Sequence, residues 1–475
     1  MKKIKSSSSY IVILCILRCL CVWCNGEDET VSAPMKRTEQ EVLYSAIQDF
    51  VGKWWNGSDL YPDPCGWTPI QGVSCDIFDG FWYVTDLSIG PVYENSLICD
   101  QTVGFSPHLF ALRHLKSLSF FSCFVSPHPV SIPAQNWEVF AESLVSLEFR
   151  SNPGLTGQIP ATFAELRNLE SLVLMENGLT GEIPINIGNL TKLKRLNLAG
   201  NRFKGEVPDN FGGLNHLLIL DFSSNSFSGS LPSTFGGLTS LLKLDLSNNQ
   251  FEGKIPENIK NLKNLTLLDL SSNKFSNGLT KSLQELTSLE EIFLSNNPIG
   301  GSLADVEWHD MVRLTALDLS NTILTGGIPE SFSELKGLRF LGLSDNMLAG
   351  DVSPKLANLP NVSAIYIHGN NLTGDLKFPK GFYEKLGRRF AAWGNPNLCY
   401  PIGSIPTNYV PFGVKICKQY QEVKRYETCL HTKSKICAGI RNPDSISMAS
   451  MGFMVSYVGR LVWFIEIMGA LILNI

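Results

Sequence analysis

Cysteine is the residue type in this sequence whose spacing could support redox, metal or nucleophilic chemistry. The chain has 12 cysteines in 475 residues, and four of them lie within the first 26 residues. The other eight leave residues 124–398 free of cysteine, and they contain no Cys-x-x-Cys and no Cys/His spacing typical of zinc. We therefore expect disulfides at both ends of a long middle region, without a bound metal or a catalytic thiol. The eight are Cys65, Cys75, Cys99, Cys123, Cys399, Cys417, Cys429 and Cys437.

Other kinds of chemistry have little support in the sequence. No Ser/His/Asp set or paired carboxylate stands out, and neither the glycine-rich loop nor the His-Arg-Asp loop of a kinase occurs. The formal net charge of -5 gives no basic field that would recruit nucleic acid. We expect a binding protein rather than an enzyme, with no cofactor and no nucleic-acid partner.

The N-terminus predicts export from the cell. Residues 1–26 combine Lys2, Lys3 and Lys5 with an apolar stretch that ends near Gly26, the layout of a cleaved signal peptide. Five Asn-x-Ser/Thr sequons are compatible with a secreted glycoprotein. Their acceptors are Asn56, Asn189, Asn264, Asn361 and Asn371.

A repeat occupies the cysteine-free middle of the chain. One asparagine position recurs every 24 residues, with two intervals of 25, and each asparagine follows the pattern Leu-x-x-Leu-x-Leu-x-x-Asn. Ten units share this position: Asn152, Asn177, Asn201, Asn225, Asn249, Asn273, Asn297, Thr322, Asn346 and Asn370. Two degenerate units, around Leu87 and Leu118, precede them.

The pattern predicts a stacked solenoid. Leu-x-Leu alternation is typical of a strand with one buried face, and a buried asparagine amide can bond the backbone of adjacent turns. One such unit cannot bury its leucines alone, so the units must stack, with a parallel concave sheet and capped ends. Trp308, in a unit that departs from the pattern, is expected in the convex core; the alternative is a lateral contact site.

The strand positions between the leucines should face the concave side, where a ligand would bind. Aromatic side chains and arginines commonly anchor interfaces. A row of aspartates on the same face, Asp221, Asp245, Asp269 and Asp318, is interpreted as part of the generic repeat. The candidate ligand-binding residues are Glu148, Arg150, Met175, Arg195, Phe293, Phe340, Tyr366 and His368.

Caps should close both ends of the solenoid. Thr38 and Glu41 match a capping box at the start of an amphipathic helix. At the N-terminal end we pair Cys65 with Cys75 and Cys99 with Cys123, although four cysteines allow three connectivities. At the C-terminal end, a cap containing Cys399 and Cys417 and a further loop closed by Cys429 and Cys437 are expected.

The repeated Leu-x-Gly-x-Ile-Pro segments, such as 179–184 and 251–256, resemble the plant-specific class of leucine-rich repeats. With the cap around Trp54 and Cys75, residues 38–420 are similar to plant receptor-like proteins that lack a kinase, and specifically to the Piriformospora indica-insensitive protein 2 group. The resemblance implies a surface receptor or co-receptor for an extracellular peptide or protein in microbial or developmental signalling, with a receptor kinase as partner. The alternative is a secreted inhibitor of a pathogen cell-wall-degrading enzyme, similar to polygalacturonase-inhibiting proteins.

The C-terminal tail predicts attachment to the plasma membrane. Small residues, a polar spacer and a terminal apolar stretch resemble a glycolipid-anchor signal, whereas a transmembrane helix would have to include Arg460 and Glu466. A secreted chain in the cell wall or apoplast is the third possibility. The expected organisation is a signal peptide at 1–26, an N-terminal cap at 27–83, the solenoid at 84–376, a C-terminal cap and cysteine loop at 377–437, and a spacer with the anchor at 438–475.

Overall fold

The computed structural model describes residues 34–92, 97–403, 405 and 407–417. The signal peptide, the Cys429/Cys437 loop and the anchor tail predicted from the sequence lie outside the described residues. Within the described part, no helix is both long and apolar enough to cross a membrane.

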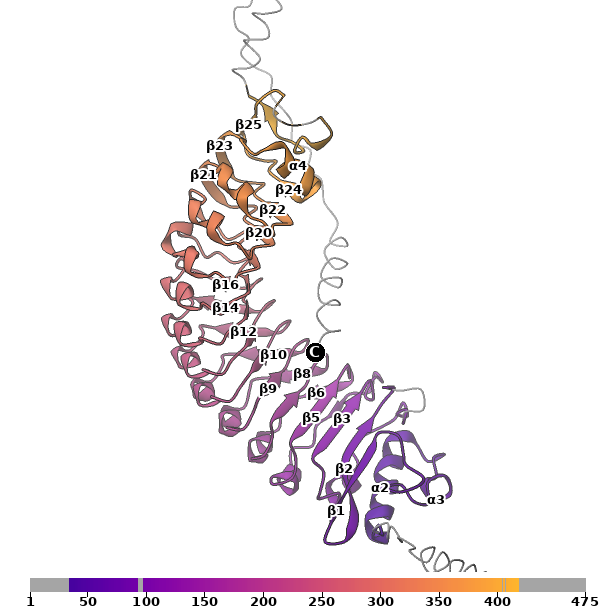
Figure 1. The fold of residues 1–475 in the computed structure, drawn as a ribbon. Coiled ribbons are helices and arrows are strands. Elements are labelled where there is room, and N and C mark those ends of the chain that lie inside the picture. The colour runs from indigo at the N-terminus through magenta and orange to yellow at the C-terminus, as the bar shows by residue number, and fades with distance from the viewer. Residues whose placement is uncertain (1–33, 93–96, 404, 406, 418–475) are drawn as a thin grey trace, which may run out of the picture. The chain divides into compact units, whose positions relative to one another are not determined.

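A continuous sheet runs through the stack of repeats (Figure 1). Its first two strands pair antiparallel and all later neighbours pair parallel, as stacked leucine-rich repeats require. The leucines of each Leu-x-Leu pair are buried; Leu196, Leu198, Leu244 and Leu246, for example, are at most 1% exposed. The predicted fold class, a leucine-rich-repeat solenoid, is confirmed. The 14 strands are β1 (Val73–Phe78), β2 (Phe81–Ile89), β3 (Ser117–Phe121), β5 (Ser146–Arg150), β7 (Ser171–Val173), β9 (Arg195–Asn197), β11 (Ile219–Asp221), β13 (Lys243–Asp245), β15 (Leu267–Asp269), β17 (Glu291–Phe293), β18 (Ala316–Asp318), β20 (Phe340–Gly342), β22 (Ala364–Tyr366) and β24 (Phe390–Ala391).

Short 3-10 helices return the chain on the outer, convex side of the stack (Figure 1). Trp308 lies here, fully buried, and its indole nitrogen donates to the Leu303 carbonyl at 2.7 Å. The preferred interpretation of Trp308 as a convex core residue is therefore confirmed. The helices are η1 (Pro107–Ala111), η2 (Trp137–Phe140), η3 (Ala161–Glu165), η4 (Ile185–Asn189), η5 (Asp209–Gly213), η6 (Ser233–Gly237), η7 (Glu257–Asn261), η8 (Lys281–Glu285), η9 (Leu303–Asp305), η10 (Trp308–Asp310), η11 (Glu330–Glu334) and η12 (Pro354–Asn358).

A second layer of short parallel strands lies between the concave sheet and these helices along the chain. It is split into two sheets, because the unit around Asn297 and Gly300 contributes no strand to it. The first sheet contains β4 (Val130–Ser131), β6 (Leu155–Gly157), β8 (Gly178–Gly181), β10 (Arg202–Gly205), β12 (Ser226–Gly229), β14 (Gln250–Gly253) and β16 (Lys274–Phe275). The second contains β19 (Thr325–Gly326), β21 (Met347–Asp351), β23 (Asn371–Asp375), β25 (Asn397–Tyr400) and β26 (Lys415–Ile416).

The repeating asparagines form a hydrogen-bond ladder through the core. Asn273 is typical: its amide nitrogen donates to the carbonyls of Leu246 and Leu270, and its oxygen accepts from the Phe251 N–H at 3.0 Å. These bonds satisfy backbone groups that burial would otherwise leave unpaired. The Thr322 hydroxyl donates to the Leu319 carbonyl and to Asn346, and the Ile299 N–H of the preceding unit bonds to the Asn297 carbonyl instead of to a ladder side chain. This substitution coincides with the break in the second layer.

The N-terminal cap consists of α2 (Arg37–Val51), α3 (Gly57–Leu60) and the β1–β2 hairpin. The predicted capping box is wrong. The helix begins one residue before Thr38, with Lys36 at the N-cap and no side-chain cap bond, so Glu41 accepts from Arg37 at 2.8 Å instead. The disulfides Cys65–Cys75 and Cys99–Cys123 form as predicted.

The C-terminal cap extends the solenoid further than the sequence pattern predicted. Asn395 continues the ladder, donating to the Ile367 carbonyl at 3.0 Å and accepting from the Leu372 N–H at 2.9 Å. Its unit adds β24 to the concave sheet, followed by the predicted Cys399–Cys417 disulfide. The helix α4 (Lys380–Leu386), with η13 (Gly387–Arg389) and η14 (Thr407–Tyr409), covers this end.

Candidate ligand-binding surface

Each concave strand presents its non-leucine positions in register with those of its neighbours. In β13 these positions are Lys243 and Asp245, and Ser247 follows the strand. The register places Asp221, Asp245, Asp269, Phe293, Asp318, Gly342, Tyr366 and Ala391 in one row across the sheet, which we call the aspartate row.

The N-terminal candidates carry charge rather than aromatic area. Arg150 forms an ion pair with Glu148 at 2.9 Å, and the two side chains are 35% and 23% exposed. Met175 is half-buried and Arg195 is exposed. The guanidinium of Arg150 therefore already has a partner within the chain.

The middle of the aspartate row is tied to the backbone turn after each strand. One carboxylate oxygen of each aspartate accepts the N–H of the serine two residues later, at 2.9 to 3.0 Å. This supports the interpretation of the aspartates as part of the repeat, since the bond closes the same turn in each of the four units that carry one. The four bonds join Asp221 to Ser223, Asp245 to Ser247, Asp269 to Ser271 and Asp318 to Ser320.

Asp221, Asp245 and Asp269 also ionise less readily than ordinary carboxyls. Burial raises the pKa of Asp245 to about 7, with the charges of Asp269 and Asp221 adding to the effect. Burial likewise raises the pKa of Asp269 to about 6, against the hydrogen bonds from Ser271. The pKa of Asp221 is raised by the same desolvation. A positive group placed on this row would favour the ionised forms.

The aromatic candidates gather at the C-terminal end of the sheet. Phe340 meets the edge of Tyr366 with ring centroids 5.6 Å apart, and Tyr366 lies 6.3 Å from His368. Phe293 stands apart from them, between Asp269 and Asp318 in the row.

Two further aromatic residues, which the sequence reasoning missed, continue this group. Trp393 stacks on His368 with centroids 4.2 Å apart, and Phe412, 83% exposed, meets Trp393 at 6.2 Å. The usable signal was the interval of 25 residues from Asn370 to Asn395, which places Trp393 one strand beyond His368. We call Phe340, Tyr366, His368, Trp393 and Phe412 the C-terminal aromatic cluster.

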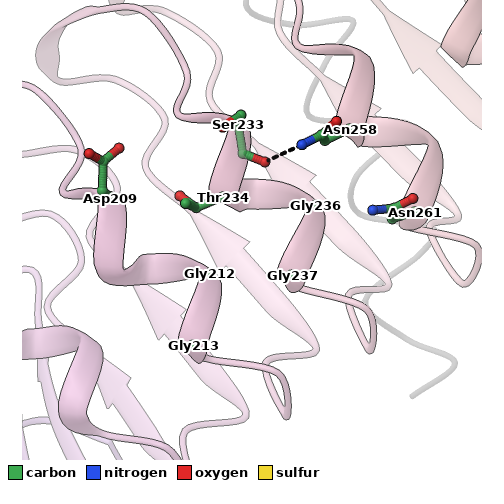
Figure 2. A pocket seen from close by; sticks show the side chains of 9 residues that line it. All are labelled: Asp209, Gly212, Gly213, Ser233, Thr234, Gly236, Gly237, Asn258 and Asn261. Carbon is green, nitrogen blue, oxygen red and sulfur yellow. Dashed lines mark hydrogen bonds between the residues drawn. The ribbon is translucent and has the colours of Figure 1, made fainter.

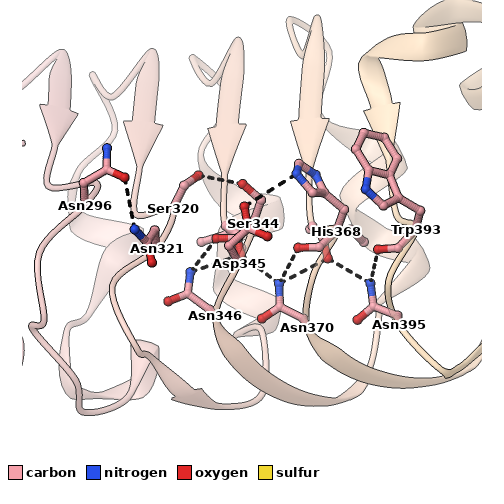
Figure 3. Close-up of polar contacts among 12 residues, drawn as sticks. Asn296, Ser320, Asn321, Ser344, Asp345, Asn346, His368, Asn370, Trp393 and Asn395 are labelled. Carbon is pink, nitrogen blue, oxygen red and sulfur yellow. Dashed lines mark hydrogen bonds and ion pairs between the residues drawn. The ribbon is translucent and has the colours of Figure 1, made fainter. Parts of the chain in front are cut away.

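His368 is the polar member of this cluster (Figure 3). Its Nε2 atom lies 3.8 Å from the Asp345 carboxylate, and its Nδ1 atom is buried without a hydrogen-bond partner in the described part of the chain. Burial lowers the pKa of His368, and Asp345 opposes that shift. Burial therefore favours the neutral form of the ring, which packs against Trp393.

The convex side offers a hollow but no candidate site. It lies between η5, η6 and η7 and is lined largely by small residues (Figure 2). A Cβ at Gly212 would lie 2.4 Å from the Thr234 carbonyl oxygen, so these glycines allow close packing of successive turns.

The asparagines of the five sequons are all exposed to solvent, and their glycosylation stays a prediction.

Comparisons with known proteins agree with this architecture. The family described as "Leucine-rich repeat region" matches residues 185–305, and "Leucine Rich Repeat" matches residues 168–190 and 313–335. Among solved structures, the plant peptide hormone receptor RGFR1 in complex with RGF2 has a TM-score of 0.56 and 25% identity, covering 71% of this chain and 61% of that one. The crystal structure of PEPR1–AtPEP1 has a TM-score of 0.59 and 24% identity, covering 77% of this chain and 52% of that one. At this identity the likeness supports a shared fold and nothing more. The chain thus spans less than two thirds of either receptor chain.

Curated relatives are more specific. Receptor like protein 29 of Arabidopsis thaliana is 34% identical over 155 residues, 32% of this chain and 32% of that protein. Piriformospora indica-insensitive protein 2 of Arabidopsis thaliana is 69% identical over 414 residues, 85% of this chain and 97% of that protein. Because this identity extends over almost the whole relative, the chain belongs to the Piriformospora indica-insensitive protein 2 family of plant leucine-rich-repeat receptor-like proteins.

Proposed function

We propose that this protein is a cell-surface receptor-like protein or co-receptor that binds an extracellular peptide or protein ligand along the concave sheet. It would act in microbe interaction or development and rely on a receptor kinase partner, since the sequence carries no kinase motif of its own. The observation that carries the proposal is the C-terminal aromatic cluster. Side chains of this size and type are the ones that anchor interfaces.

The position of the cluster supports recognition rather than folding. Trp393 and Phe412 are 39% and 83% exposed, although the neighbouring leucines are fully buried. Exposed aromatic area is costly in water unless a partner covers it. The similarity to RGFR1, whose structure contains RGF2, supports a peptide as the class of ligand.

The concave surface is tested by a combined variant, R150E with F293A and Y366A. The full chain is secreted with an affinity tag, crosslinked in extracellular fluid, and its bound peptides and proteins are quantified by mass spectrometry. We expect at least one bound species to fall by about tenfold or more while secretion is unchanged, because interface anchors are removed. The matched control, I185A with K260E, alters exposed convex residues in η4 and η7 and should retain binding.

Equal capture by the concave variant and wild type, with normal secretion, would overturn the concave site. It would leave the secreted-inhibitor alternative to be tested against pathogen cell-wall-degrading enzymes.

Membrane attachment through residues 438–475 is part of the same proposal. Treatment of intact cells with phosphatidylinositol-specific phospholipase should release a glycolipid-anchored chain into the medium. Retention in the membrane after treatment would favour a transmembrane segment instead. Full recovery in the medium without treatment would contradict any anchor.

A further inference from the structure

The aspartate row has one position without a side chain. Gly342 in β20 occupies it, with Asp318 of β18 on one side and Tyr366 of β22 on the other. Because neighbouring strands are about 4.8 Å apart, Asp318 and Tyr366 are separated by roughly 9 to 10 Å across this position. We call this position, between Asp318 and Tyr366, the Gly342 gap.

An acidic group borders the gap on its N-terminal side. A Cβ at Gly342 would lie 2.5 Å from Oδ1 of Asp318 and 3.0 Å from Oγ of Ser320, so the carboxylate leans across the space that a side chain would fill. Oδ1 accepts the Ser320 N–H at 3.0 Å. No lysine, arginine or histidine among the described residues forms an ion pair with Asp318.

Two aromatic rings lie beside the gap. Tyr366 stands across it in β22, and Phe340, two residues before Gly342 in β20, meets Tyr366 at an interplanar angle of 81°. Both side chains are half-buried, so part of each ring is exposed near the carboxylate. Aromatic faces and carboxylates both attract cations, and a guanidinium can stack on the first while pairing with the second.

The rest of the row adds little to this negative charge. Burial raises the pKa of Asp269, Asp245 and Asp221, so these carboxyls ionise less readily. The acidic character of the gap is therefore that of Asp318, which a basic ligand would complement.

On this basis we propose that the Gly342 gap receives an arginine side chain of an extended peptide ligand, with its guanidinium between Asp318 and Tyr366. This rests on the proposed function, because it specifies the chemistry of the ligand. Arginine fits better than lysine, because its planar group can stack on Tyr366 while it pairs with Asp318. The C-terminal aromatic cluster beyond the gap would take an apolar residue of the same peptide.

Two variants alter the gap. G342V fills it with the residue that the chain carries at the same position in β7, Val173, and its Cβ has to displace the Asp318 carboxylate, whose Oδ1 would lie 2.5 Å away. D318N removes the charge but can keep the turn, since Asn197 in the same row accepts the Ala199 N–H at 2.9 Å. The matched control, D221N, makes the same substitution in the same row, four strands away from Asp318.

The probe is a random linear peptide library displayed on phage and selected against the full-length wild-type chain. We expect enriched peptides to share an arginine, and a synthetic copy with citrulline in its place to bind at least about tenfold more weakly. G342V and D318N should each weaken the arginine peptide by a similar factor, whereas D221N should change it by less than about threefold.

Three results would overturn the inference. Enriched peptides without arginine, or an arginine peptide insensitive to G342V and D318N, would reject the gap but leave concave recognition standing if F293A and Y366A still weaken those peptides. Absence of any enriched peptide would count against both the gap and the proposed function. Self-association of the wild-type chain that D318N abolishes would assign the gap to a second copy instead.

Discussion

The middle and the C-terminal end of the concave sheet differ along the aspartate row. The middle carries Asp221, Asp245 and Asp269, and the C-terminal end carries Gly342, Tyr366 and Ala391. The middle aspartates are committed to closing the turn of their own repeat. The equivalent positions at the C-terminal end carry no carboxylate to close the turn in this way, and the aromatic rings of Phe340 and Tyr366 lie on the surface there. We therefore expect positions that depart from the repeat to carry recognition and positions that keep its residue types to belong to the framework, with Asp318 at the boundary between the two.

The largest effect is expected from removal of Trp308, because this residue supports the irregular unit between the two regions. Trp308 is fully buried, donates to the Leu303 carbonyl and packs against Phe332 with centroids 5.4 Å apart. We expect W308A to lower the free energy of unfolding by about 3 to 5 kcal/mol through the cavity it leaves. Urea unfolding followed by circular dichroism measures it.

W393A is the control for that experiment. Trp393 is 39% exposed, so its loss should cost about 1 kcal/mol or less. Equal destabilisation by the two substitutions would mean that the C-terminal aromatic cluster is as structural as the core.

The sequence predicted the framework well because the repeat is periodic. Leucine alternation located the two degenerate and ten regular strands, and the asparagine spacing located the ladder. The unit of Asn395 escaped prediction because Phe390 and Ala392 occupy its leucine positions. Trp393 was missed with it.

Other features were beyond the reach of pattern reasoning. The helix α2 starts one residue before Thr38, and Glu41 pairs with Arg37; the residue types at 38–41 alone do not reveal this start. The stacking of His368 on Trp393 depends on the register of two strands, which a single sequence does not give. Of the candidate site, Phe340, Tyr366 and His368 were predicted individually but not as one cluster.

Ligand affinity should depend on the C-terminal aromatic cluster more than on the middle of the aspartate row. Y366A should weaken any ligand captured by the wild-type chain by about 2 kcal/mol, roughly thirtyfold, because a central aromatic anchor is lost. D245N, in the middle of the row, should change the same affinity by less than about 1 kcal/mol. Biolayer interferometry with the captured ligand tests both, and a larger effect of D245N would reverse the assignment of the two regions.

The stability of the middle of the aspartate row should depend on pH, which can be measured without a ligand. The pKa values of Asp245 and Asp269, about 7 and about 6 in the folded state, lie above the unfolded value near 4. The protonated acids therefore favour folding, and their contribution is complete below about pH 4 and lost as the pH rises to about 7. The D245N/D269N double variant should lack this loss, so its stability should fall less than that of wild type between pH 5 and pH 8. Thermal melts at pH 5 and pH 8 measure the difference, and parallel melting of variant and wild type at both pH values would contradict it.

The smallest effect is expected at the N-terminal end of the concave sheet. Arg150 and Glu148 form a partly exposed ion pair, and such pairs contribute about 0 to 1 kcal/mol. R150A should therefore change stability by no more than that, and ligand affinity by less than Y366A does, because its guanidinium is already paired within the chain. Side-by-side titrations of R150A and Y366A decide the point. If R150A were the more damaging variant, recognition would be centred on the first regular repeats, and the aromatic end would be secondary.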